Sequence, residues 1–210
     1  MTQRQKAQQV YEAIGILFPG ARCELNYSSP LELLVAIILS AQTTDKSVNA
    51  LTPTLFAKYK SLESYASASQ IDMENDLRHL GLYKNKAENI RMMAKKVLDD
   101  FRGEIPNEQT ALESLPGVGR KTANVFLSEY YRIPRIAVDT HVYRVATRLG
   151  FSSEADTPEK VEIKLMRLYP RSQWIDLHHR LIFFGRYFCK AKKPACAECP
   201  IISICLKPQI

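Results

Sequence analysis

Hydrophobic residues recur with a helical period along almost the whole chain. Val10, Ile14 and Leu17 lie at i, i+4 and i+7, which places them on one face of a helix. The same kind of pattern predicts helices over residues 46–59, 70–79, 85–101, 108–113, 121–131, 140–149, 158–168 and 173–187. Residues 135–138 could be extended, but no run alternates as a strand in a sheet would. The pattern therefore predicts an all-α fold.

Two proline-containing segments mark helix starts. Ser29 suits the N-cap position, Pro30 the first helical position, and Glu32 would complete a capping box. The helix that follows is apolar nearly all round, so we expect it to be central and buried. Thr157 and Pro158 form a second start of the same kind. The helical period lapses around 23–29 and 131–135, which are the expected boundaries between domains.

Composition and charge narrow the class of protein. The chain has 210 residues, of which 46% are hydrophobic and 24% charged, as in an ordinary globular protein. Its net charge of +7 permits a polyanionic partner. The longest apolar run, 33–39, is far shorter than the ~20 residues of a membrane-spanning helix. The N-terminus does not have the pattern of a signal peptide. We therefore expect a cytosolic protein with reduced thiols.

Four of the five cysteines gather at the C-terminus. Cys189, Cys196, Cys199 and Cys205 have the spacing C-x6-C-x2-C-x5-C, whereas Cys23 stands apart as an expected free, buried cysteine. Cysteines that staple a small secreted fold would be spread along the chain. Four thiolates can bind zinc or a [4Fe–4S] cluster. Structural zinc more often shows two C-x2-C pairs, and only one such pair is present here.

A glycine-containing turn separates two predicted helices at Leu115-Pro116-Gly117-Val118-Gly119. Both glycines allow positive φ and a close approach of the backbone to a ligand. The helix that begins near Arg120 presents unpaired N–H groups, which form an anion site. The segment departs from a nucleotide P-loop and from a dinucleotide fingerprint, and no strand precedes it. A backbone-phosphate clamp and a plain connection between helices both remain open.

Three motifs together resemble one family. Leu115–Gly119 followed by Arg120-Lys121-Thr122-Ala123 resembles the helix–hairpin–helix of DNA glycosylases, and 138–142, Val-Asp-Thr-His-Val, resembles a second element of that superfamily. With the cysteine tail, the chain from about 5 to 206 is similar to the endonuclease III family. The resemblance implies a six-helix, barrel-like lobe over 24–134 that carries the hairpin. It also implies a second lobe formed by 1–23 and 135–210, with DNA bound in the cleft between them.

The resemblance assigns catalysis to Lys121 and Asp139. Lys121 lies at a helix start, where the macrodipole, the neighbouring Arg120 and burial would favour a neutral, nucleophilic amine. Asp139 precedes an apolar helical run, so it also suits an N-cap. Its carboxylate could assist deprotonation of the amine and stabilise positive charge at the sugar C1′. The resemblance thus implies a bifunctional glycosylase and lyase.

The implied reaction starts with attack of Lys121 on C1′ of an oxidised pyrimidine nucleotide in duplex DNA. The Schiff base that results acidifies the C2′ proton and permits β-elimination of the 3′ phosphate. The related adenine-specific glycosylase lacks this lysine and carries a glutamate where our alignment places Ala36. The four C-terminal cysteines hold a [4Fe–4S] cluster in the family.

The resemblance also suggests DNA-contacting residues. Gln42 matches an inserted glutamine that would pair with the orphaned base, and Leu82 matches an apolar wedge, although without the resemblance Leu82 would be interpreted as a core leucine. Asp45 and His141 would line the base pocket. The remaining expected DNA contacts lie in the hairpin and between the first two cysteines: Leu115, Gly117, Val118, Gly119, Arg120, Lys192 and Lys193.

Two other functions compete with this hypothesis. The chain could be a non-catalytic DNA-binding module that keeps the hairpin and cluster, or a glycosylase for another lesion class, such as mismatched thymine. In each case the expected partner is double-stranded DNA, with damaged bases or abasic sites for an enzyme. We expect no membrane partner. We expect a monomer that works in the cytoplasm in association with the nucleoid.

Overall fold

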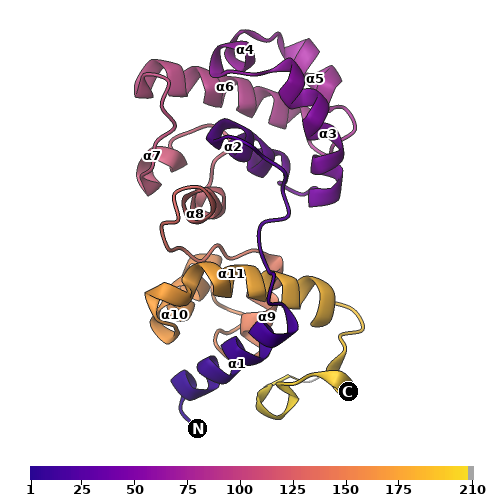
Figure 1. Cartoon of the computed structure of the whole chain (residues 1–210), viewed down its shortest axis with the longest axis vertical. Coiled ribbons are helices and arrows are strands. Elements are labelled where there is room, and N and C mark those ends of the chain that lie inside the picture. The colour runs from indigo at the N-terminus through magenta and orange to yellow at the C-terminus, as the bar shows by residue number, and fades with distance from the viewer. Residues whose placement is uncertain (208–210) are drawn as a thin grey trace. The chain divides into compact units, whose positions relative to one another are not determined.

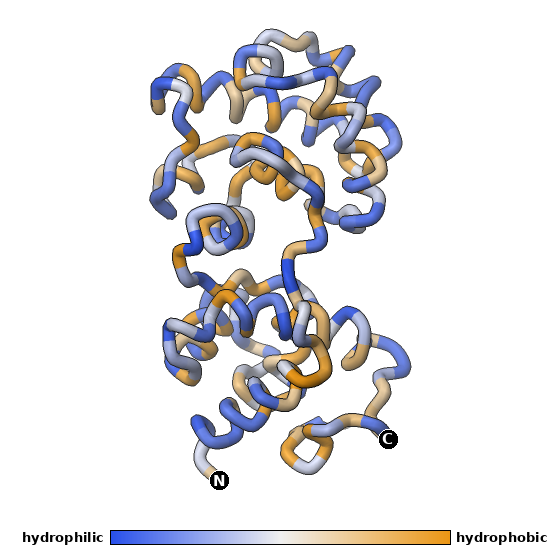
Figure 2. Tube along the Cα trace, viewed as in Figure 1, coloured by the Kyte–Doolittle hydropathy of each residue, from blue (hydrophilic) through white to orange (hydrophobic). Residues whose placement is uncertain are grey.

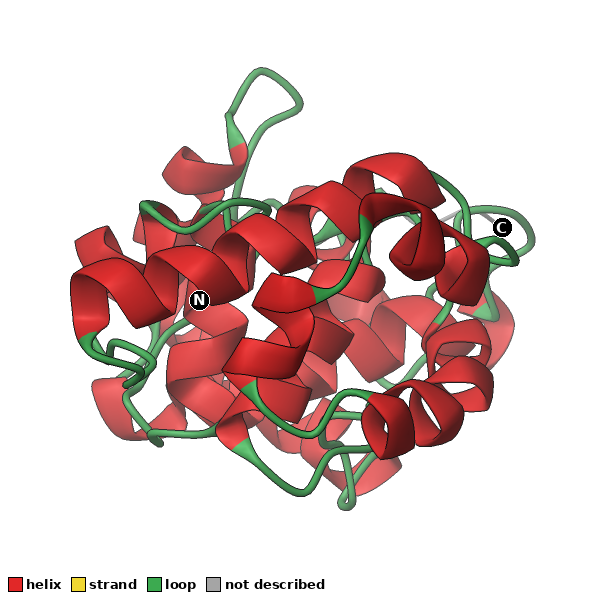
Figure 3. Cartoon of the chain, turned by 90° about the horizontal axis from the view of Figure 1, so that it is seen from above, coloured by secondary structure: helices red, strands yellow, loops and turns green. Residues whose placement is uncertain are grey.

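A computed structural model of the chain describes residues 1–207. Within that range the secondary structure is helical, with no strand (Figure 3). The prediction of an all-α fold is therefore confirmed. The chain divides into two compact units, one formed by Glu24–Tyr131 and the other by Met1–Cys23 together with the chain from Arg132 onward. No helix of the described residues is long and apolar enough to cross a membrane.

The continuous unit is built around one buried helix. Its helices are α2 (Pro30–Leu39), α3 (Asp45–Lys58), α4 (Leu62–Ser67), α5 (Gln70–Leu77), α6 (Tyr83–Phe101), α7 (Gln109–Glu113) and α8 (Arg120–Glu129), labelled in Figure 1. Residues 33–39 of α2 are all buried, and α2 packs against α3, α6 and α8. Figure 2 shows α2 as largely hydrophobic. The expectation of a central, buried helix is confirmed.

The start of α2 differs in one detail from the predicted capping box. The Ser29 hydroxyl accepts the N–H of Glu32 at 3.2 Å, as an N-cap should. The Glu32 carboxylate, however, accepts from both the backbone N–H and the hydroxyl of Ser28, each at 2.6 Å. The capping-box prediction was wrong for Glu32, because Ser28 offers two donors to one carboxylate oxygen. The predicted cap at Thr157 is confirmed.

Helix α4 was missed by the sequence pattern. It has only 6 residues, fewer than two turns, so no hydrophobic period can repeat within it. The signal that could have found it is its cap: Ser61 accepts the N–H of Ser64 at 3.3 Å, while the Ser64 hydroxyl accepts the N–H of Ser61 at 3.1 Å. The continuous unit therefore has one helix more than the pattern predicted.

The discontinuous unit joins the N-terminal helix to the C-terminal half of the chain. Its α-helices are α1 (Gln3–Leu17), α9 (Thr140–Arg148), α10 (Pro158–Leu168) and α11 (Trp174–Phe183). Val10 and Ile14 of α1 are buried in one core with Val142 and Val145 of α9. The helix predicted over 173–187 is α11 followed by a π-helical turn over Phe184–Phe188.

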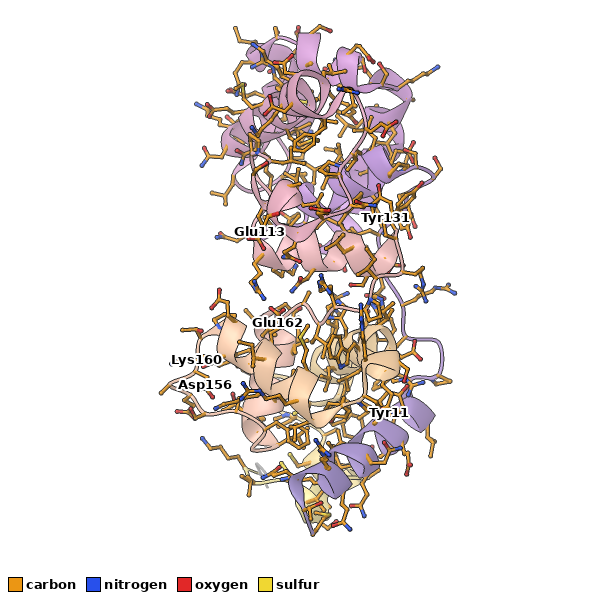
Figure 4. All side chains as sticks on the ribbon, turned by 90° about the vertical axis from the view of Figure 1, so that its left-hand side faces the viewer. Tyr11, Glu113, Tyr131, Asp156, Lys160 and Glu162 are labelled. Atoms are coloured by element: carbon orange, nitrogen blue, oxygen red, sulfur yellow. The ribbon has the colours of Figure 1, made fainter. Side chains whose placement is uncertain are left out.

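One labelled residue of each unit in Figure 4, Tyr131 and Asp156, makes hydrogen bonds that hold a loop in place. The Tyr131 hydroxyl donates to the carbonyl of Ile105 at 2.9 Å, which ties the end of the continuous unit to the loop after α6. Asp156, just before α10, accepts from Lys164 Nζ at 2.5 Å and from the N–H of Ser153 at 2.7 Å. These hydrogen bonds, from Lys164 first, lower the pKa of Asp156 to about 2. The charged form of this loop carboxylate is thereby favoured.

Replacement of Thr52 by valine should stabilise the protein. Thr52 on α3 is 1% exposed, and its hydroxyl has no hydrogen-bond partner among residues 1–207. Valine keeps the shape and removes an unsatisfied buried oxygen, so the free energy of unfolding should rise by about 1 kcal/mol. Urea denaturation checks this, with Thr54→Val at an exposed position of the same helix as the control. A fall in stability for Thr52→Val alone would contradict the prediction.

Candidate active site and cluster loop

The turn between α7 and α8 is anchored by two buried apolar side chains. Leu115 is 2% and Val118 4% exposed, and the Val118 N–H donates to the Leu115 carbonyl at 3.0 Å. Gly117 has φ of +79°, and a Cβ there would stand 2.9 Å from Cβ of Asn89 on α6. Both the backbone and the close neighbour therefore require glycine at this position. Any DNA contact at Leu115 and Val118 would come from their backbone.

The second glycine of the hairpin has a different role from the predicted one. Gly119 has φ of −93°, so the expectation of positive φ is correct only for Gly117. Gly119 is exposed and is the N-cap of α8, and no side chain caps that helix end. A glycine here leaves the first N–H groups of α8 accessible. Arg120 is also exposed beside them, so the helix end can receive an anion such as a phosphate.

Lys121 lies in the first turn of α8 and is exposed. Burial of Lys121 was expected to be one cause of a nucleophilic amine. That expectation is wrong for the continuous unit by itself, in which Lys121 is exposed. The helix N-terminus and the adjacent Arg120 are present as expected. The amine is therefore open to a substrate that approaches this helix end.

Asp139 is the N-cap of α9, as its sequence position predicts. Its Oδ1 accepts the N–H of Val142 at 2.8 Å, and the residue is half-buried. The extended segment before it, Ile136–Val138, is buried and makes no sheet. In the first turn of α9, His141 Nδ1 lies 3.2 Å from a guanidinium nitrogen of Arg144. The cap thus fixes the carboxylate at the start of a helix that is anchored in its own unit.

Gln42 and Leu82 both adopt left-handed backbone conformations at exposed positions. Gln42 has φ of 52° in the loop after α2, and Leu82 has φ of 59° just before α6. Leu82 is 51% exposed, so it is not a core leucine. A Cβ on Gly81 would lie 3.8 Å from the Gln42 carbonyl oxygen, which places the two loops side by side. Asp45 lies in the first turn of α3, after the N-cap Thr44.

The C-terminal cysteines gather around one another. Burial raises the pKa of the Cys199 thiol, and the charges of Cys189, Cys205 and Cys196 raise it further. None of these cysteines is in a disulfide. Cys23 is also not in a disulfide, but it is half-buried and not fully buried as expected, because it lies where the chain passes from one unit to the other.

Two arginines of α9 hold the cysteine loop. Arg148 donates to Cys189 Sγ at 3.2 Å and to the Lys190 carbonyl at 2.8 Å, and Arg144 donates to the Cys189 carbonyl at 3.2 Å. Cys205 Sγ in turn lies 3.5 Å from the Arg148 carbonyl. The sequence reasoning missed both arginines, although their i, i+4 spacing on the helix after Asp139 was visible. They stabilise negative charge near the sulfurs.

The donor set fits an iron–sulfur group. The four thiols lie near enough to influence one another's charge, and the Arg148 guanidinium donates to the sulfur of Cys189, which favours a thiolate there. Among residues 1–207, no group of three or more His, Cys, Asp or Glu side chains is arranged to hold a metal ion directly.

The two lysines predicted to contact DNA, Lys192 and Lys193, lie between the first two cysteines and are exposed, and Lys193 has φ of 52°.

Comparisons with known proteins identify the class. Residues 35–171 match the family model described as "HhH-GPD superfamily base excision DNA repair protein". Residues 189–205 match the model described as "Iron-sulfur binding domain of endonuclease III". The chain is therefore a base-excision DNA repair protein of the HhH-GPD superfamily, with an iron–sulfur domain at its C-terminus.

The relatives narrow the class to one family. Endonuclease III of Bacillus subtilis (strain 168) is 51% identical over 198 residues, which cover 94% of this chain and 90% of the relative. Endonuclease III of Escherichia coli (strain K12) is 44% identical over 187 residues, which cover 89% of this chain and 88% of the relative. The structure of a trapped endonuclease III–DNA covalent intermediate matches with a TM-score of 0.95 at 45% identity. The match covers 98% of this chain and 96% of the chain in that structure.

This chain belongs to the endonuclease III family. It is a bifunctional DNA glycosylase and abasic-site lyase of base-excision repair, and it carries a [4Fe–4S] cluster. A thermostable thymine-DNA glycosylase shares the fold, with a TM-score of 0.86 at 24% identity.

Proposed function

We propose that Lys121 and Asp139 carry out the removal of oxidised pyrimidines from duplex DNA. Lys121 Nζ attacks C1′ of the flipped nucleotide, the C1′–N bond breaks, and the base leaves with the bonding electron pair. The sugar ring then opens to a Schiff base on Lys121. Loss of the C2′ proton expels the 3′ phosphate, and water releases the amine. Asp139 accepts the proton from the lysine and stabilises the positive charge at C1′.

The observation that carries this proposal is the exposed amine at an uncapped helix N-terminus that follows a glycine hairpin. Backbone N–H groups of α8 can bind a phosphate of the strand and so bring Lys121 to the sugar. The likeness to a trapped endonuclease III–DNA covalent intermediate supports a covalent step. The half-buried Asp139, held by its cap, supports a carboxylate of fixed orientation.

We also propose roles for the other predicted residues. Gln42 pairs with the orphaned base and Leu82 fills the gap in the stack, which their exposure supports. Asp45 and His141 line the base pocket. The four C-terminal cysteines are the ligands of the cluster, which would supply the folding energy of a tail too short for a core of its own. The protein acts as a monomer on the nucleoid, in the cytoplasm.

A panel of duplexes tests the function. Duplexes with thymine glycol, a G·T mismatch, 8-oxoguanine or uracil should be incubated with the cluster-loaded protein, and released base and strand cleavage measured. Excision and cleavage should be fastest with thymine glycol. Preference for G·T would instead favour a mismatch glycosylase. Binding to all four without release of any base would favour a non-catalytic DNA-binding module.

Joint replacement of Lys192 and Lys193 by alanine should weaken binding to every DNA sequence. If both lysines contact phosphates, the slope of log K against log salt should flatten by about 1.8. Fluorescence anisotropy across a salt series measures that slope. The control removes the same charge at two other exposed lysines, Lys60 and Lys160, with little expected change in slope. An unchanged slope for the cluster-loop variant would refute the contact.

A further inference from the structure

A buried lysine lies beneath the two loops that carry Gln42 and Leu82. Lys86, in the first turns of α6, is 3% exposed although its own segment, Tyr83-Lys84-Asn85-Lys86, is polar. Burial lowers the pKa of its ammonium group. A buried cation destabilises a fold unless it is well paired, and no carboxylate is recorded beside Lys86 among residues 1–207. Because the buried charge destabilises the fold, we expect Lys86 to have a functional role.

The bonds of Lys86 connect both loops. Its Nζ donates to the hydroxyl of Thr43, the residue directly after Gln42, at 2.6 Å. Its backbone N–H donates to the carbonyl of Leu82 at 3.0 Å, which is the first backbone hydrogen bond of α6 and does not depend on the side chain. The lysine side chain therefore links the start of α6, whose N-cap is Leu82, to the residue next to Gln42.

Both loop residues need such support. Left-handed conformations of residues other than glycine persist only where the surroundings hold them, and Gln42 and Leu82 are mostly solvated. The Thr43 N–H donates to the Ser40 carbonyl at 3.1 Å, so the Thr43 hydroxyl, held by Lys86, forms a second fixed point of this short loop. The Lys86 side chain therefore fixes Thr43, and with it the end of the Gln42 loop, to the start of α6.

We propose that Lys86 is a positioning residue that couples the Gln42 and Leu82 loops, so that both side chains enter the DNA stack together. The proposal rests on the proposed function, in which these two residues replace the flipped nucleotide. Lys86 does not touch the reacting atoms. It acts through the Thr43 hydroxyl, and its contribution is confined to the step in which a base leaves an intact stack.

Replacement of Lys86 by methionine tests the proposal with two substrates. Single-turnover excision of thymine glycol from duplex DNA should fall about 10- to 100-fold, since a small misplacement of positioning groups has effects of this size. Borohydride trapping on a single-stranded abasic oligonucleotide, which has no stack to open, should change by less than about 3-fold. The melting temperature should stay the same or rise, because methionine removes a buried charge.

Variants of Thr43 sharpen the test. Thr43→Val removes the acceptor and should show the same loss of duplex excision, whereas Thr43→Ser keeps the hydroxyl and should restore it. The combination of Lys86→Met with Thr43→Val should be no worse than either alone, as expected for two partners in one bond. Thr52→Val, which removes a buried hydroxyl without a partner in the same unit, is the matched control.

Equal losses on the two substrates, or no loss on either, would overturn the coupling role of Lys86. Multiplicative losses in the double variant would overturn it as well. A wild-type protein that binds abasic duplex DNA but neither excises thymine glycol nor forms an adduct would refute the proposed function itself, and the Lys86 proposal with it. The two failures are therefore distinguishable.

Discussion

Replacement of Lys121 by glutamine should abolish the borohydride-trapped adduct with abasic DNA. Glutamine has similar length and hydrogen-bonding capacity but no nucleophilic amine, so neither the Schiff base nor β-elimination can occur. Base excision should fall at least about a thousand-fold, as for loss of other covalent nucleophiles. Gel analysis of the adduct and of strand cleavage measures both activities.

The exposure of Lys121 makes this variant easy to interpret. The side chain is exposed at the start of α8, so its loss leaves the core of the continuous unit intact and the melting temperature should stay unchanged. Lys95→Gln, at an exposed position of α6, removes the same charge and is the matched control, with full activity expected. Adduct formation by Lys121→Gln would show that another amine is the nucleophile.

The sequence predicts most of the helices because their hydrophobic periods are local. In α2, capping and an apolar run together indicate a buried helix, and the structure confirms it. Lys86 shows where such reasoning ends. It lies on the same helix face as the buried Ile90 and Met93, but its hydrogen-bond partner, Thr43, is 43 positions away and follows from no local pattern. Leu82 is the opposite case, since it is an apolar residue that is 51% exposed and has a left-handed backbone conformation.

In the candidate site, too, some features follow from the local sequence and others depend on contacts between distant residues. The turn at Gly117 and the cap at Asp139 follow from local residue types and are present as predicted, whereas Gly119 does not have the expected positive φ. The i, i+4 spacing of Arg144 and Arg148 places them on one helix face, but their support of the cysteine loop depends on the packing of α9 against the C-terminal segment, which that spacing does not reveal. The exposure of Lys121 likewise depends on packing around α8. Local chemistry was thus predictable, and long-range support was not.

Replacement of Asp139 by asparagine should separate catalysis from stability. Asparagine caps a helix about as well as aspartate, so the hydrogen bond to the Val142 N–H can persist and the melting temperature should change little. The variant lacks the negative charge that accepts the lysine proton and stabilises C1′. Excision should therefore fall about 100- to 1000-fold, in the range found for loss of one stabilising group.

Replacement of Asp139 by alanine removes both the charge and the helix cap. Activity should therefore fall as in Asp139→Asn, while the free energy of unfolding also falls by about 1 kcal/mol. Thr157→Ala removes the cap of α10 in the same unit and should reduce stability without loss of excision. If Asp139→Asn kept full activity while Asp139→Ala lost it, the carboxylate charge would be unnecessary. Asp139 would then serve only to cap α9, and the proton acceptor for Lys121 would have to be another group.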